Sequence, residues 1–476
     1  MENKNNSTNL PALYTLMTVW FFWSFVAASN GILIPLFKEK FELQQWQAQL
    51  VDFAFYAAYF VGSVLYLMLS SIMKTDILNK IGYKNGIIYG LIISAVGSLI
   101  FYPAAETKSY FLLLTALFVV GLGFSLQQTA TQPFMIALGP PETGATRINL
   151  GGAVNNFGGT IGPLIVSYAI FGSISPEAAL SATIESVKVP YLLLGGLFVL
   201  VAVFFWISKL PRITNDEHVE AGLGALKYPQ LILGMSAIFV YVGVEVTIGS
   251  NLPEYLKETQ GLVSSQVSKY VSLFWGSMMV GRWTASVGNF GLSDSLKKLL
   301  WVVVPFVAFA IVLYVNSIMS GDVSDLYPYG FCVIVMIVSF FMAKEKPVRT
   351  LLIYTGVGAV MTLIGVFTTG KIALFSLISG GLFCSILWPS IFSLGTAGLG
   401  KYTNQGSAFM IMMILGGAII PVLQGVIADN VGIQTSYLLA VACFAYLFWF
   451  GFRIQQVLRK QNIDFDKEVG NVKGGH

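Results

Sequence analysis

The stretch Pro133-Phe-Met-Ile-Ala-Leu-Gly139 is echoed 256 residues later by Pro389-Ser-Ile-Phe-Ser-Leu-Gly395. A second stretch, Gly158-Gly-Thr-Ile-Gly-Pro163, is echoed 258 residues later by Gly416-Gly-Ala-Ile-Ile-Pro421. Chance matches would rarely agree so closely in their offset. The two echoes therefore indicate an internal repeat, in which two similar halves follow each other in the chain.

The composition places both halves in a membrane. Of the 476 residues, 55% are hydrophobic and only 11% are charged, whereas a soluble domain carries about 25% charged residues. Apolar stretches recur from end to end, each of about 20 residues, which is the length a helix needs to cross the hydrocarbon core. Lipid offers the backbone no partners, so such stretches form helices, and the short alternating segments of barrel strands are not seen. We predict an all-α membrane protein.

We expect about fourteen membrane-spanning helices. The apolar segments lie near residues 11–36, 48–72, 83–103, 109–137, 147–171, 189–208, 229–256, 265–290, 297–316, 325–343, 349–369, 371–396, 404–427 and 434–456. A charged stretch separates the sixth segment from the seventh, and a polar stretch follows the last one.

The basic residues predict the orientation. If the N-terminus is cytoplasmic and the segments alternate, 19 of the 27 Lys and Arg residues fall on the cytoplasmic side and 7 fall outside, with Arg282 inside a span. An excess of positive charge marks the cytoplasmic side of membrane proteins. We therefore expect both termini in the cytoplasm and residence in the cell inner membrane. The polar start, Met1 to Leu10, lacks the features of a signal peptide, so we expect the first helix to be uncleaved.

A third, weaker echo indicates an insertion in the second half. Pro35 with Lys38-Glu39 is echoed by Pro253 with Lys257-Glu258 at an offset of about 218, so the offset grows by about 39 residues before the later echoes. Two extra helices with a short turn would fill that gap, and their acidic tip, Gly321-Asp-Val-Ser-Asp325, would lie outside. The alternative is a hairpin that only dips into the membrane.

Two parallel halves are the architecture of the major facilitator fold. We predict two six-helix bundles with an inserted transmembrane hairpin. The expected domains are an N-terminal bundle at 1–208, a cytoplasmic linker at 209–230, a C-terminal bundle at 231–456 that includes the hairpin at about 297–343, and a cytoplasmic tail at 457–476.

Several motifs carry a resemblance to a known family. They are Asn30-Gly-Ile-Leu-Ile-Pro35, Ala54-Phe-Tyr-Ala-Ala-Tyr-Phe60, Tyr102-Pro-Ala-Ala-Glu106, Gln128-Thr-Ala-Thr-Gln-Pro-Phe134, Asn155-Asn-Phe-Gly158, Tyr241-Val-Gly243 and Gly281-Arg282. In combination they make the chain resemble the fucose:proton symporter family of the major facilitator superfamily. The branch that it resembles most is the bacterial glucose/galactose transporter group.

The resemblance implies uptake of a monosaccharide through a central cavity, coupled to a cation. In the fucose:proton members an Asp in helix one and a Glu in helix four carry the coupling. The aligned positions here are Gly31 and Gln128, so both carboxylates are missing. The family also contains sodium-coupled glucose transporters, which leaves Na+ or H+ open as the coupling ion and an uncoupled facilitator as an alternative.

Uncharged polar residues inside apolar helices are candidates for sugar contacts. Amides offer both a donor and an acceptor without a charge to bury, which suits a ring of hydroxyls. The candidates are Asn30, Gln128, Gln132, Asn149, Asn155 and Asn156. Tyr241, Trp275 and Trp388 are candidate aromatic contacts, and Trp388 pairs by position in the repeat with Gln132. The alternative for the amides is hydrogen bonding between helices.

Three ionisable residues of the apolar segments are candidates for a functional role, because charged groups inside a membrane are often functional. Glu245, about midway through its segment, is the first candidate for cation coupling, and its alternative is a structural bond to another helix. Asp52 starts the second segment and either lines the outer entrance or is simply solvated. Arg282 we interpret as a gating and structural residue rather than a substrate contact, with Asp76 and Asp294 as nearby carboxylates.

Other classes of function find little support. The two histidines, His218 and His476, lie outside the apolar segments, and no metalloprotease or Walker motif occurs, so we expect no enzyme and no catalytic residues. Cys332, Cys384 and Cys443 lie in apolar segments and indicate neither a disulfide framework nor a metal site. A drug exporter of the same superfamily and a nontransporting sensor remain alternatives. The expected partners are a sugar and membrane lipid, with no nucleic acid and no cofactor beyond a coupling ion, and we expect a monomer.

Overall fold

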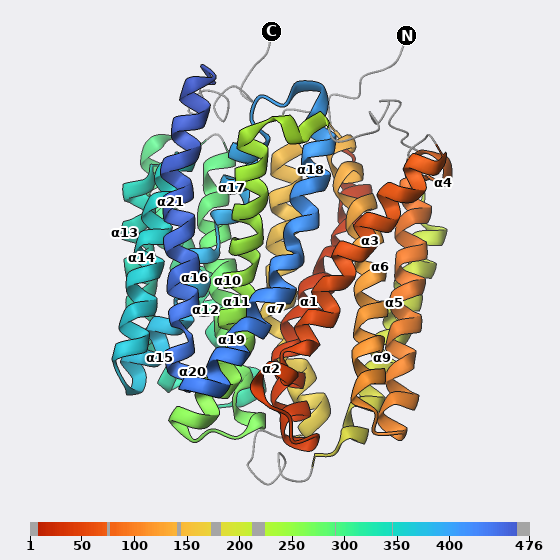
Figure 1. The fold of residues 1–476 in the computed structure, drawn as a ribbon, viewed down its shortest axis with the longest axis vertical. Coiled ribbons are helices and arrows are strands. Elements are labelled where there is room, and N and C mark those ends of the chain that lie inside the picture. The colour runs from red at the N-terminus through yellow and green to blue at the C-terminus, as the bar shows by residue number, and fades with distance from the viewer. Residues whose placement is uncertain are drawn as a thin grey trace.

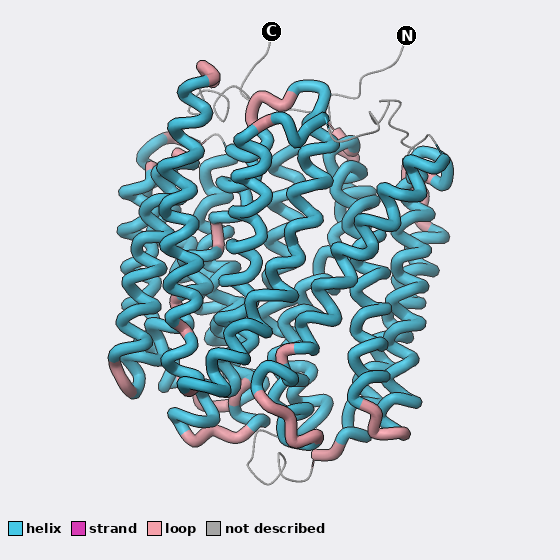
Figure 2. The backbone as a smooth tube through the Cα atoms, in the orientation of Figure 1, coloured by secondary structure: helices cyan, strands magenta, loops and turns pink. Residues whose placement is uncertain are grey.

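The chain forms a bundle of long helices that run between two ends of the molecule (Figures 1 and 2). The computed structural model describes residues 8–73, 77–139, 144–172, 182–211, 224–290, 292–344 and 346–463. Every regular element in these ranges is a helix. Most of the expected linker and most of the expected tail lie outside the described residues.

The first half of the chain contains six long helices and several short ones. They are α1 (Leu10–Lys40), α2 (Gln45–Ala48), α3 (Leu50–Met73), α4 (Ile77–Ile81), α5 (Tyr83–Glu106), α6 (Tyr110–Ala137), α7 (Gly144–Phe171), η2 (Ile184–Val187) and α9 (Lys188–Ile207).

The second half has more elements, because several of its segments are broken. They are η3 (Gly224–Lys227), α10 (Pro229–Gln260), η4 (Ser264–Gln266), α11 (Ser268–Ser286), η5 (Val287–Phe290), α12 (Asp294–Ser320), η6 (Ser324–Tyr329), α13 (Gly330–Ala343), α14 (Pro347–Phe367), α15 (Gly370–Ile378), α16 (Gly380–Cys384), α17 (Leu387–Thr396), η7 (Gly400–Tyr402), α18 (Thr403–Met412), η8 (Met413–Leu415), α19 (Gly416–Val431), α20 (Ile433–Ser436) and α21 (Leu438–Lys460).

The described residues contain 12 helical segments that are long and apolar enough to cross a membrane. Two further helices, α7 and α11, pack against each other and against these segments. The prediction of an all-α membrane protein with about fourteen helices is therefore confirmed. The start of α1 and the end of α21 lie at one end of the bundle, here called the proximal end (Figure 1). The distal end, opposite it, carries α2 and α20.

The glycines of the sequence repeat allow helices to approach at backbone distance. A Cβ atom added at Gly158 of α7 would lie 2.2 Å from the carbonyl oxygen of Phe21 in α1. A Cβ atom added at Gly416 of α19 would lie 1.7 Å from the carbonyl oxygen of Phe239 in α10. No larger residue fits in either place. The repeated motif thus gives the same kind of close helix pair in each half.

The inserted hairpin is α12 and α13, joined by η6. Both arms belong to segments long enough to cross a membrane, which disfavours a hairpin that only dips. Polar contacts tie the hairpin to α11. Asn316 donates to Ser272 Oγ at 3.0 Å, and Asp325 accepts from the Tyr270 hydroxyl at 2.6 Å and pairs with Lys269 Nζ at 2.7 Å. Because each of these polar groups has its partner on α11, the hairpin packs as part of the second half.

The position of the hairpin can be tested by labelling. With the proximal end in the cytoplasm, Asp322 lies at the outer end of α12 and is exposed. We expect a cysteine at Asp322 in intact cells to react with a membrane-impermeant maleimide. A matched cysteine at Asp294, which is exposed at the opposite end of the same helix, should react only after the cells are opened. The opposite labelling pattern would show that the orientation is inverted. Protection of both cysteines from the maleimide would contradict a hairpin that spans the membrane.

Candidate functional site

The two halves are joined at the distal end by polar side chains. Gln45 of α2 donates to Asn251 of α10 at 2.9 Å, and Gln49 donates to the same amide oxygen at 3.3 Å. All three residues are buried. The hydroxyl of Ser272 in α11 donates to the Thr160 carbonyl of α7 at 2.7 Å. These neutral contacts close the distal end of the interface between the halves.

Charged groups complete this closure. Asp429 of α19 accepts hydrogen bonds from the backbone amides of Gln45 and Trp46, at 2.8 and 3.0 Å, at the start of α2. Lys38 at the end of α1 pairs with Glu254 of α10. A carboxylate is well placed at the positive end of a helix, so the α19 carboxylate and the α2 amides form a charge-assisted clasp between the halves. We call the contacts that close the distal end the distal gate. They join Gln45 and Gln49 to Asn251, Thr160 to Ser272, Lys38 to Glu254, and the backbone amides of Gln45 and Trp46 to Asp429.

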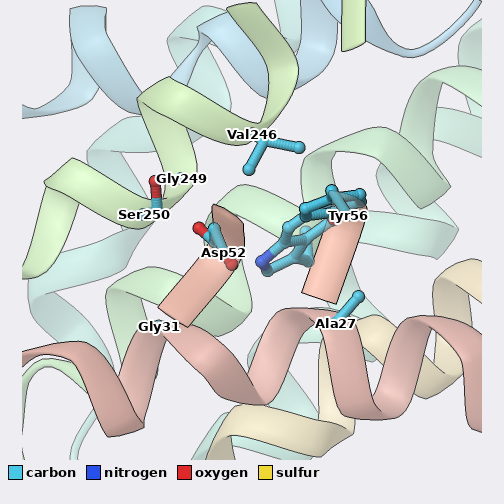
Figure 3. A pocket seen from close by; sticks show the side chains of 8 residues that line it. Ala27, Gly31, Asp52, Tyr56, Val246, Gly249 and Ser250 are labelled. Carbon is cyan, nitrogen blue, oxygen red and sulfur yellow. The ribbon is translucent and has the colours of Figure 1, made fainter. Parts of the chain in front are cut away.

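A small cavity lies at the interface next to the distal gate (Figure 3). Its volume is about 10 Å³, which is room for one water-sized particle. Its lining comes from both halves: Ala27, Gly31, Asp52, Tyr56, Val246, Gly249, Ser250 and Trp275. In Figure 3 the Asp52 side chain lies between Gly31 of α1 and Ser250 of α10.

Asp52 is a buried carboxylate rather than a solvated one. It is 2% exposed, and its Oδ1 accepts a hydrogen bond from Asn30 Nδ2 at 2.9 Å. The hydroxyl of Ser250, across the interface, also lies close enough to interact with it. The structure therefore decides against a simple solvated helix start, which the sequence had left open. Asn30, expected among the sugar contacts, instead holds this carboxylate with its amide.

Glu245 lies half-buried on α10 among aromatic and basic groups. Its carboxylate lies beside the Tyr241 hydroxyl and within electrostatic reach of Arg282. No ion pair within 4.0 Å joins Glu245 and Arg282. The Tyr241 ring lies 6.1 Å from the ring of Trp388, measured between centroids, and Trp388 is half-buried. The structure thus brings together Glu245, Tyr241 and Trp388, three of the residues that the sequence singled out.

Arg282 satisfies a backbone group that the sequence leaves free. Pro389 of α17 has no N–H, so it cannot bond the carbonyl of Ser385 four residues earlier. The segment breaks there, between α16 and α17, and Arg282 Nε donates to that carbonyl at 3.1 Å. A Cβ atom at Gly281 would lie 1.9 Å from Ser385 Oγ. These contacts give Arg282 a structural task.

Of the two carboxylates considered as partners of Arg282, Asp294 belongs to the described residues and forms no bond to Arg282. Asp76 lies outside the described residues. Asp294 is exposed at the start of α12 and forms no ion pair within the described chain. The guanidinium instead lies near Gly152 of α7, 3.7 Å from the position of an added Cβ atom. Arg282 therefore spans from its own half to the other one.

Several amides of α6 and α7 have unused hydrogen-bonding groups. Gln132 and Asn155 are half-buried, and neither has a partner among the described residues. The Nδ2 of Asn156 is buried without a partner. Gln128, in contrast, donates to the Tyr59 hydroxyl at 3.2 Å, and the side chain of Asn149 is outside the described part. A buried unpaired donor costs about 1–3 kcal/mol, so these groups are suited to a polar ligand.

Some residues of the interface escaped the sequence reasoning. Ser250, Asn251 and Asp429 all lie toward the distal ends of α10 and α19. Small polar residues near helix ends are normally solvated, so nothing in the sequence distinguishes these. Gln49 was missed for the same reason, because it comes just before α3. Their roles depend on the contact between the halves.

The fold and the interface define a multi-pass membrane protein built of two repeated helical bundles around a shared polar interface. The chain matches the Major Facilitator Superfamily over residues 12–344. It belongs to that superfamily, as the sequence motifs predict.

Relatives cover nearly the whole chain. A glucose/galactose transporter of Brucella abortus is 35% identical over 445 residues, which are 92% of this chain and 93% of the relative. The L-fucose-proton symporter of Escherichia coli is 29% identical over 92% of each chain. The resemblance to these two groups, expected from the motifs, is thereby confirmed.

Solved structures share the architecture. The Escherichia coli fucose:proton symporter FucP in its outward conformation has a TM-score of 0.62 and 27% identity, over 94% of this chain and 99% of that one. A bacterial homologue of the lysosomal transporter Spinster, in an inward-facing conformation, also has a TM-score of 0.62. At 13% identity the latter shows the fold alone. The predicted major facilitator fold is confirmed.

The strength of the distal gate can be tested at Asp429. Asp429→Asn removes the charge from two hydrogen bonds, a loss of about 1–3 kcal/mol, so we expect the distal ends to separate about tenfold more often. Spin labels on cysteines at Thr107 and Lys371, both exposed at the distal ends of the two halves, would report this as a longer distance by pulsed electron paramagnetic resonance.

The matched control is Asp322→Asn, which removes a carboxylate at the same end that is exposed and outside the interface. It should leave the distance distribution unchanged. Equal distributions for Asp429→Asn and the unmodified gate would show that the clasp does not hold the halves together.

Proposed function

We propose that this chain imports a monosaccharide of the glucose/galactose type by alternating access, coupled to a cation. The observation that carries the proposal is the group of unpaired amides and aromatic rings in the interior of a fold whose relatives are named sugar transporters. A sugar needs neutral donors and acceptors and an apolar face. The interior of this bundle supplies both, whereas a drug exporter would gain little from unpaired amides.

The orientation follows from the basic residues. We place the protein in the cell inner membrane, with the proximal end and both termini in the cytoplasm, because 19 of 27 Lys and Arg residues then lie inside. The closed distal gate is then the outer gate, and the structure corresponds to a state closed to the outside. The protein acts as a monomer, since each chain contains both halves of the interface.

The sugar site is formed by α6, α7, α10 and α17. Gln132, Asn155 and Asn156 donate to and accept from sugar hydroxyls, while Trp388 and Tyr241 pack against the ring. Gln128 joins them through its free amide oxygen, since only its Nε2 is used by Tyr59. A site whose polar groups stay unpaired without the right hydroxyls rejects other solutes strongly.

Transport follows from rocking of the halves around this site. Rigid bundles of this fold expose a midplane site to each side in turn. The distal gate opens to admit sugar and closes behind it. Glu245 and Asp52 are the membrane-embedded carboxylates available to a coupling cation, Na+ or H+, and Arg282 steadies the inner part of the interface.

Uptake into vesicles tests the function. The purified chain should accumulate labelled glucose or galactose when either a sodium or a proton gradient is imposed, and the two gradients are applied separately. Fucose and N-acetylglucosamine serve as competing candidates. Entry that equilibrates without accumulation under both gradients would identify an uncoupled facilitator, and no uptake of any sugar would contradict the proposal.

The sugar site is tested by two substitutions in the interior. Trp388→Ala removes the stacking surface and Gln132→Leu removes a donor and an acceptor, each a loss of about 1–3 kcal/mol. We expect each to raise KM for the transported sugar about tenfold or more. Trp449→Ala, at an exposed position on the bundle surface, is the matched control. Unchanged KM in both interior variants would place the sugar elsewhere.

A further inference from the structure

We propose that Asp52, Asn30 and Ser250 form the binding site of the coupling cation, and that the distal gate closes only when this site is occupied. This inference rests on the proposed transport function and refines it, because it assigns the cation to Asp52 and not to Glu245. The ligand class is a small monovalent cation, a bare Na+ or a proton.

The site is built from oxygen atoms with unused acceptor capacity. Asn30 is 1% exposed and Ser250 is 5% exposed. The Oδ1 of Asn30 is buried without a hydrogen-bond partner, and the buried Oγ of Ser250 has Asp52 alone within reach among the described residues. Both residues lie against Asp52, whose Oδ1 already accepts from the Asn30 amide at 2.9 Å. Oxygen ligands of this kind suit a hard cation, and a proton on the carboxyl group would likewise supply a missing donor.

The size of the cavity limits the ligand. Its volume of about 10 Å³ admits one water-sized particle and excludes a sugar. Gly31 contributes to this space by lacking a side chain, and a Cβ atom there would lie 3.0 Å from Val271 of α11. The cavity is therefore distinct from the sugar site, although Trp275 lines one wall of it.

The charge of Asp52 is uncompensated within the described chain. The groups that face it are Asn30 of α1, Ser250 of α10, Tyr56 of its own helix and Tyr110 of α6. None of these is positive. Lys38, on the helix that carries Asn30, is paired with Glu254 in the distal gate. An isolated buried carboxylate costs several kcal/mol, so a positive ion at the site would remove a large penalty.

Glu245 is placed differently. It is half-buried, and Arg282, which lies within electrostatic reach, offsets part of its charge. Tyr56 lies within electrostatic reach of both carboxylates. Of the two, Asp52 therefore has the greater need for a cation.

The free-energy cost of burying the Asp52 charge arises when the distal gate is closed. Asp52 lies on α3 of the first half, and Ser250 lies on α10 of the second. Separation of the distal ends would expose the carboxylate to water and relieve the penalty. Closure without a cation buries a bare charge, whereas closure over a cation also adds the Ser250 ligand. Occupancy thus favours the closed gate, and cation release to the inside returns the empty protein toward the open one.

The experiment uses the full-length protein without sugar, with spin labels at Thr107 and Lys371. In one arm Na+ replaces choline at constant pH, and in the other the pH is lowered without Na+. We expect one of these two changes to raise the ratio of closed to open gate, as read from the distance distribution, by about tenfold or more. Asp52→Asn, a neutral isostere, should stay closed and respond to neither arm. Glu245→Gln should respond as the parent protein does.

A milder variant covers the case in which Asp52→Asn fails to fold. Ser250→Ala removes one ligand and should raise the cation concentration at half-effect about tenfold, the equivalent of one hydrogen bond. Each of four results would overturn the proposal. Two of them are the absence of a cation response in the parent protein and a normal response in Asp52→Asn. The other two are loss of the response in Glu245→Gln and an unshifted midpoint in Ser250→Ala. The experiment contains no sugar, so a failure of sugar uptake would not change its result. The cation proposal and the sugar proposal can therefore fail independently.

Discussion

Every backbone polar group inside an apolar bundle must find its partner within the protein, and this constraint shapes the structure. Where Pro389 leaves the Ser385 carbonyl free, Arg282 from another helix supplies the missing donor. In the first half Arg147 likewise donates to the Met135 carbonyl near the end of α6, at 2.7 Å. Because such contacts complete the helices, most backbone groups of each half find their partners within that half. What joins them is mainly side chains, and side chains can part.

The chemistry of the distal gate suits an interface that must open and close. Amide contacts such as Gln45 with Asn251 each contribute about 1 kcal/mol net, because water replaces them when the halves separate. The ion pair of Lys38 with Glu254 is largely buried in the closed gate, and its attraction is offset by the cost of removing both charges from water, which solvates them again when the halves separate. A gate sealed by large apolar side chains would hold more tightly but would leave those side chains in water when open. Polar closure keeps both states accessible.

The sequence predicts the fold well because helix length, the repeat and the charge bias are properties of the chain itself. The hairpin was expected at about 297–343, and its arms extend from Asp294 to Ala343. The site was predicted only in part. Tyr241, Glu245 and Trp388, each singled out from the sequence, lie together in the structure, and Asn30 bonds the Asp52 carboxylate, a contact that the sequence does not predict. Burial of Asp52 depends on the approach of Ser250 from the other half, and no local pattern records that approach.

The missing carboxylate at Gly31 takes on a different meaning in three dimensions. A comparison position by position finds glycine where the resemblance places an acid in helix one, and it suggests lost coupling. The structure puts Gly31 and Asp52 on the walls of one cavity, so a carboxylate is present there, carried by α3 instead of α1. From α3 it faces Ser250 of the opposite half. Its charge is therefore buried by the closing gate itself, and under our proposal this burial links cation occupancy to the movement of the halves.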